Sequence, residues 1–174
     1  MVKRTEAVEK VINLNQDEKT EPARAPARKG IYLLPNLLTT GALFGGFYAV
    51  LSGFSGQYDW AAMAIFTAML FDGLDGRVAR MTNTQSDFGV QYDSLSDMVS
   101  FGVAPAVVAY GWGVSDLGKL GLAAAFVYAS CAALRLARFN VQAGVSDGSV
   151  FTGLPSPVAA ALVAGFVWSV HGME

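Results

Sequence analysis

The chain has 174 residues, of which 53% are hydrophobic and 15% are charged, and its formal net charge is −2. This apolar content exceeds what a soluble domain of similar length normally needs, so the composition favours a protein that lies in a lipid bilayer. The first 29 residues hold five acidic and seven basic residues, and the rest is long apolar runs broken by few charges, which argues against a nucleic-acid partner.

The polar segment 1–29 comes first, and because it lacks the apolar stretch of a signal peptide we expect a flexible tail. A membrane domain is predicted over 30–174. It contains five apolar segments, and about 20 apolar residues suffice for a helix to cross ~30 Å of hydrocarbon. The predicted helices cover residues 31–53, 60–80, 89–113, 117–139 and 157–170. The sequence therefore predicts an all-α, polytopic transmembrane bundle of about five spans, with the last charged turns of the second helix outside the bilayer.

Basic residues indicate the orientation of this bundle. Of the 12 Lys and Arg residues, 11 precede the first helix or end the second and fourth helices, which places them on one side. Only Lys119 falls on the opposite side. Since cytoplasmic loops are enriched in Lys and Arg, the tail and the charged helix ends are predicted to face the cytoplasm.

Two groups of residues are spaced so that each shares one helix face. The first acidic stripe has the spacing i, i+3, i+4, i+7 and consists of Asp72, Asp75, Gly76 and Ala79. The second acidic stripe has the spacing i, i+4, i+8 and consists of Gly89, Asp93 and Asp97. Because the connection between the two helices is short, the stripes are expected to face each other, with small residues leaving room for a ligand beside four carboxylates.

Four carboxylates in a small volume repel one another, and ionisable groups in a membrane span are costly, so something must compensate them. Carboxylate oxygens are preferred ligands of Mg²⁺ and Mn²⁺, and four can hold two ions ~3.5–4 Å apart. Such a site is suited to phosphoryl chemistry. One alternative is that the acids pair with arginines to join helix ends, but that role does not require small residues on the stripes. A second alternative is a cation transporter, although its polar residues should extend through the bilayer rather than gather at one face.

The same segment resembles the CDP-alcohol phosphatidyltransferase family, whose signature D-x2-D-G-x2-A-R-x8-G-x3-D-x3-D is matched at all eight fixed positions. The resemblance implies that the four aspartates bind the metal ions and that Asp97 is also the catalytic general base. It implies that Gly76, Ala79 and Gly89 leave room for the CDP group and that Arg80 bonds a phosphate or an acid. The family's usual core of six helices implies that this domain is C-terminally incomplete.

Segments outside the signature resemble the phosphatidylserine synthase branch of the family, and this similarity covers about 30–165. The segments are 96–106, 134–140 and 151–157. The implied reaction transfers a phosphatidyl group from CDP-diacylglycerol to L-serine. Glycerol 3-phosphate, inositol and inositol phosphate stay open as other acceptors.

Serine carries a carboxylate and an ammonium group, so its pocket needs a cation such as Arg135 or Arg138 and a polar partner such as Asn140. Anchoring at the cytoplasmic surface explains the two arginines equally well. In similar enzymes the segment that opens the first helix borders the nucleotide, so Asn36 is a candidate CDP ligand, with a helix cap as the alternative. The resemblance further implies a homodimer in the bacterial inner membrane whose site faces the cytoplasm.

Overall fold

The computed structural model describes residues 33–82, 84–142 and 153–171, and within these ranges every regular element is helical. The all-α prediction is therefore confirmed for the described residues. In chain order the elements are α2 (Leu33–Phe54), α3 (Tyr58–Thr82), α4 (Asp87–Asp97), the π-helical η1 (Met98–Val103), α5 (Ala104–Trp112), the 3₁₀-helical η2 (Val114–Leu117), α6 (Lys119–Gln142) and α7 (Ser156–His171). The predicted tail 1–29 and the first two residues of the 151–157 segment lie outside the described residues.

Each predicted helix is present, with ends within three residues of the predicted ones, but the third is not regular. It runs as α4, η1 and α5, and the central part is π-helical. Pro105 explains this, because a proline has no N–H to bond the carbonyl four residues earlier and its ring crowds that carbonyl. The carbonyl concerned belongs to Phe101, and it instead accepts a hydrogen bond of 3.1 Å from the Tyr128 hydroxyl of α6. The wider π turn thus accommodates the proline directly after the second acidic stripe.

Small residues allow α2 to approach two neighbours at once. A Cβ at Gly45 would lie 3.1 Å from the backbone oxygen of Ala64 in α3, and a Cβ at Gly46 would lie 2.6 Å from the Cα of Ser100 in η1. Gly and Ala permit such close backbone packing between membrane helices. The helix α2 therefore fixes α3 on one side and the α4–η1 segment on the other, which are the two elements that carry the acidic stripes.

The outer surface is rich in large apolar side chains, as expected for a protein that contacts lipid. Helix α6 shows this clearly, since Leu120, Phe126 and Leu134 are each at least 70% exposed. By length and composition α2 and the 119–141 part of α6 can cross a membrane, and α7 is a shorter apolar helix. These helices indicate membrane association, and the count of five spans stays a prediction.

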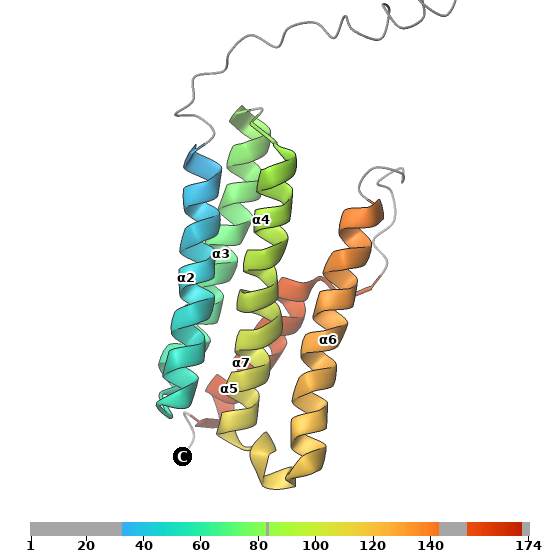
Figure 1. Cartoon of the computed structure of the whole chain (residues 1–174). Coiled ribbons are helices and arrows are strands. Elements are labelled where there is room, and N and C mark those ends of the chain that lie inside the picture. Colours follow the sequence, from blue (N-terminus) through green and yellow to red (C-terminus); the bar gives the residue numbers. More distant parts are fainter. Residues whose placement is uncertain (1–32, 83, 143–152, 172–174) are drawn as a thin grey trace, which may run out of the picture.

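The helices run so that the predicted cytoplasmic charges share one end of the bundle. Figure 1 shows that α2 and α4 begin at the upper end, where α3 and α6 finish. Lys119 begins α6 at the opposite end. The first acidic stripe lies in the half of α3 nearer the upper end, and the second runs along α4 to its last residue, Asp97. Because α4 is the upper part of the third helix, the acids and the described arginines lie in the same part of the molecule.

Candidate functional site

The four aspartates of the two stripes, here called the acidic cluster, come from α3 and α4. Carboxylate oxygens of Asp72, Asp75 and Asp93 lie within 4.8 Å of one another. The carboxyl group of Asp97 lies near those of Asp72 and Asp93. Helical spacing puts each pair on one face, and the short connection between α3 and α4 turns the two faces together.

The surroundings of the acidic cluster suit a hard cation. Asp75 is only 5% exposed, and the Thr39 hydroxyl of α2 donates a hydrogen bond of 2.7 Å to its Oδ2 atom. The Oδ1 atom of Asp93 is buried and has no hydrogen-bond partner among the described residues. This oxygen has no partner in the described ranges and belongs to a group of carboxylates whose oxygens lie within 4.8 Å of one another. Mg²⁺ and Mn²⁺ prefer such a set of carboxylate oxygens. The residues present therefore fit a divalent ion.

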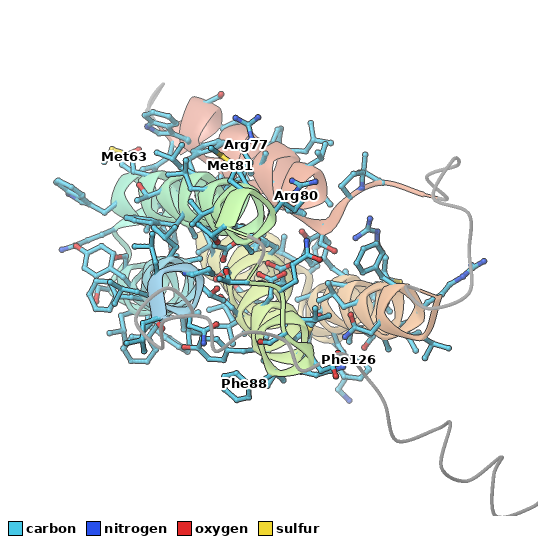
Figure 2. All side chains as sticks on the ribbon, turned by 90° about the horizontal axis from the view of Figure 1, so that it is seen from above. Met63, Arg77, Arg80, Met81, Phe88 and Phe126 are labelled. Atoms are coloured by element: carbon cyan, nitrogen blue, oxygen red, sulfur yellow. The ribbon has the colours of Figure 1, made fainter. Side chains whose placement is uncertain are left out.

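Arg77 and Arg80 follow the first acidic stripe on α3, and no hydrogen bond from either to a carboxylate of the cluster is found among the described residues. Arg80 donates from Nε to the backbone oxygen of Gly76 at 2.9 Å, and its side chain is exposed. Figure 2 shows Arg77 and Arg80 on the side of α3 that is turned toward α7, while Phe88 points outward from α4. Arg80 is thus available at the charged end of the bundle rather than bonded into a helix-joining ion pair.

The three small residues of the stripes have different surroundings. A Cβ at Gly76 would meet no atom within 4 Å, so there is open space for a ligand. Ala79 is partly exposed. At Gly89, by contrast, a Cβ would lie 3.2 Å from the Ser86 hydroxyl that caps α4 and 3.7 Å from Oδ1 of Asn36. Gly89 therefore makes room for the cap and for Asn36, which brings the candidate CDP ligand of α2 next to the start of the second stripe.

The three residues suggested for serine binding lie along the last turns of α6. Arg135 donates from Nη1 to the Ser156 hydroxyl of α7 at 3.0 Å, and its Nε is buried with no partner among the described residues. Arg138 is exposed. Asn140 donates from Nδ2 to the Ser94 hydroxyl of α4 at 2.9 Å. Arg135, whose buried Nε has no partner in the described part of the chain, thus meets the requirement for a buried anion better than the exposed Arg138.

Three polar residues of this region were not singled out from the sequence, namely Thr39, Ser94 and Ser156. Thr39 follows Asn36 by three positions and so shares its helix face, which was a usable signal. The roles of Ser94 and Ser156 depend on how α6 packs on α4 and α7, and no spacing within either helix reveals that packing.

Comparison with known proteins gives consistent matches. The family model described as CDP-alcohol phosphatidyltransferase matches residues 32–173. A CDP-diacylglycerol–serine O-phosphatidyltransferase of Helicobacter pylori is 43% identical over 133 residues, which is 76% of this chain and 56% of that protein. An archaetidylserine synthase of Methanothermobacter thermautotrophicus is 42% identical over 135 residues, covering 76% of this chain and 57% of that protein.

A CDP-diacylglycerol–serine O-phosphatidyltransferase of Methanocaldococcus jannaschii is 49% identical over 102 residues, covering 59% of this chain and 47% of that protein. The chain thus spans about half the length of the curated relatives that it matches. The residues 32–173 that match the family model include the two helices that carry the acidic cluster.

Proposed function

The chain belongs to the CDP-alcohol phosphatidyltransferase family, and from this premise we propose that it transfers the phosphatidyl group of CDP-diacylglycerol to the hydroxyl of L-serine, giving phosphatidylserine and CMP. The observation that carries the proposal is the acidic cluster, in which carboxylates from two helices converge beside the open space at Gly76. Phosphoryl transfer needs this combination, because a charged pyrophosphate must be held and neutralised where an attacking hydroxyl can reach it.

We propose that the cofactor is Mg²⁺ or Mn²⁺, in two ions held by Asp72, Asp75, Asp93 and Asp97. When bound, such ions neutralise pyrophosphate charge and stabilise a departing phosphate. Family enzymes depend on divalent metals in general. The buried Oδ1 of Asp93, for which residues 33–82, 84–142 and 153–171 provide no hydrogen-bond partner, supports a cation at this position, because a buried oxygen without a partner is otherwise costly.

The chain's own residues have separate tasks in the proposed reaction. Asp97 accepts the proton of the serine hydroxyl while the serine oxygen forms a bond to the phosphorus that carries diacylglycerol. The bond from that phosphorus to the bridging oxygen breaks, and CMP leaves with the electron pair. Asn36, Gly76, Ala79, Gly89 and Arg80 are proposed to border the CDP group.

For the acceptor, we propose that Arg135 binds the serine carboxylate and that Asn140 helps to form the pocket. The Nε of Arg135, which is buried and has no partner among the described residues, supports this assignment, since a guanidinium presents two parallel donors to a carboxylate. The three relatives support serine over glycerol 3-phosphate or inositol, because each is named for a reaction that involves serine.

The proposed location is the bacterial inner membrane, with about five crossings and the site open to the cytoplasm. The apolar surfaces of α2 and α6 support insertion, and the arginines at one bundle end support this orientation. We propose membrane lipids and a second copy of the chain as partners, the latter from the family resemblance alone.

A direct assay tests the acceptor. Full chain in lipid vesicles is given CDP-diacylglycerol, Mn²⁺ or Mg²⁺, and labelled serine, glycerol 3-phosphate or inositol in parallel. We expect label from serine alone to enter lipid, with CMP released in equal amount and no transfer after metal chelation. Label from another alcohol would replace serine as the acceptor, and no transfer from any alcohol would contradict activity of this chain.

Filling the open space on the first stripe should impair nucleotide binding. We expect Gly76→Leu to weaken CDP-diacylglycerol binding about fivefold or more, since forcing side-chain bulk into occupied space costs ~1 kcal/mol or more. Gly73→Leu is the matched control, because a Cβ at Gly73 also meets no atom within 4 Å but Gly73 lies off the stripe. Binding is measured with labelled CDP-diacylglycerol. Equal affinities for the two variants would show that the space at Gly76 does not receive the nucleotide.

A further inference from the structure

Thr39 contacts the acidic cluster from a helix that carries none of its carboxylates. This residue of α2 is 4% exposed, and its hydroxyl oxygen lies 2.7 Å from Oδ2 of Asp75 and 3.0 Å from the backbone oxygen of Pro35. A threonine hydroxyl has one hydrogen to donate, and an ionised carboxylate is a stronger acceptor than a carbonyl. The hydrogen is therefore directed mainly to Asp75.

This bond constrains how Asp75 can be oriented. A carboxylate on a helix can rotate about its side-chain bonds, and holding one oxygen fixes the direction of the other. Since Thr39 occupies Oδ2, the Oδ1 oxygen is left for the acidic cluster. Groups that hold metal-binding side chains in this way typically change metal affinity or activity ~10–100-fold when they are removed.

The backbone of the same residue holds the second acid-bearing helix. The hydroxyl of Ser96, which is 1% exposed and adjoins Asp97, donates to the carbonyl of Thr39 at 3.1 Å. One turn later the buried Ser100 hydroxyl donates to the carbonyl of Ala42 at 3.0 Å. Thr39 is thus bonded to α3 through its side chain and to α4 through its backbone.

We propose that Thr39 is a positioning residue of the metal site. Its hydroxyl holds the carboxylate of Asp75 in place, and its backbone carbonyl holds α4 in place through Ser96. The inference rests on the proposed function, because it assigns Thr39 a part in holding the same ions. A substitution at position 39 tests the side chain alone, because the backbone oxygen that accepts from Ser96 is present in every variant.

The test measures metal binding without turnover. Free Mn²⁺ is titrated by electron paramagnetic resonance against the purified full chain in detergent, without substrates, and thermal unfolding is recorded for each variant. Thr39→Val removes the donor and is expected to weaken Mn²⁺ binding about 10- to 100-fold. Thr39→Ser keeps the donor and should restore binding to near the wild-type level.

The neighbouring threonine gives a matched control. The Thr40 hydroxyl donates to the backbone oxygen of Asn36 and bonds the Tyr92 hydroxyl, and neither partner is a carboxylate of the acidic cluster, so Thr40→Val should bind Mn²⁺ as the wild type does. If Thr39→Val does not fold, Thr39→Ala supplies the measurement with a smaller side chain that also lacks the donor.

The outcomes separate this inference from the proposed function. Wild-type affinity in a folded Thr39→Val or Thr39→Ala variant would overturn the positioning role and leave the metal site intact. Loss of Mn²⁺ binding in Thr40→Val as well would also overturn it, because the effect would then not depend on the bond to Asp75. A wild-type chain that binds no Mn²⁺ would contradict the metal site itself, and with it the proposed mechanism.

Discussion

Replacing Asp97 with Asn should reduce turnover about 10²- to 10⁴-fold, because a positioned general base contributes that much to a proton-transfer step. The amide cannot accept the serine proton at neutral pH, whereas its size and shape match those of the carboxylate. Binding of CDP-diacylglycerol should be largely retained. Turnover is measured with labelled serine, and binding is measured at saturating Mn²⁺ because Asp97 is also a proposed metal ligand.

Asp87→Asn is the control for this change, since Asp87 lies in the first turn of the same helix, is exposed, and is not part of the acidic cluster. Its loss should affect only the favourable interaction with the helix N-terminus, worth ~0.3–1 kcal/mol of stability. Near wild-type turnover in Asp97→Asn would rule out Asp97 as the base. If saturating Mn²⁺ fails to restore substrate binding, Asp97 acts chiefly as a metal ligand.

The acidic cluster could be predicted because its geometry is almost entirely local. Helical periodicity puts Asp72 and Asp75 on one face of α3, and Asp93 and Asp97 on one face of α4. The connection after Thr82 is too short for the two helices to be anything but neighbours, so their faces meet. Apolar run length likewise located the helices to within a few residues.

The contacts that support the cluster could not be predicted, since they depend on how helices that are distant in sequence pack together. The sequence places Thr39 on the face of Asn36, but not beside Asp75, which is 36 positions away. Pro105 indicates a disturbed helix, yet a proline can kink or break a helix as readily as widen one turn. In the structure the helix widens into a π-helical turn, and the Tyr128 hydroxyl of α6 donates to the carbonyl of Phe101 within that turn.

The choice between Arg135 and Arg138 also required the structure. Both residues lie near the C-terminal end of one helix, and a preference for basic residues on the cytoplasmic side accounts for either. They are three positions apart, so their side chains lie close to one another on the helix surface, and only the position of α7 distinguishes them. Ser156 at the start of α7 contacts Arg135, while Arg138 stays exposed.

Neutralising Arg135 should therefore raise the KM for serine far more than the KM for CDP-diacylglycerol. A hydrogen bond between charged groups contributes ~1.5–3 kcal/mol, which corresponds to about 10- to 150-fold in the serine KM of Arg135→Gln. Arg135→Lys should recover part of this loss, because lysine keeps the charge but lacks the planar pair of donors. Kinetics are measured at saturating CDP-diacylglycerol and normalised to folded enzyme.

Arg138→Gln provides the comparison on the same helix, one turn away and exposed to solvent. If Arg138 serves only to anchor α6 at the membrane surface, its loss should lower insertion or abundance and leave both KM values unchanged in the protein that inserts. If Arg138→Gln raises the serine KM and Arg135→Gln does not, Arg138 binds the serine carboxylate. Wild-type serine KM in both variants would mean that neither guanidinium holds the carboxylate. The Nε of Arg135, which has no partner in the part of the chain that the structure describes, would then need a partner other than serine.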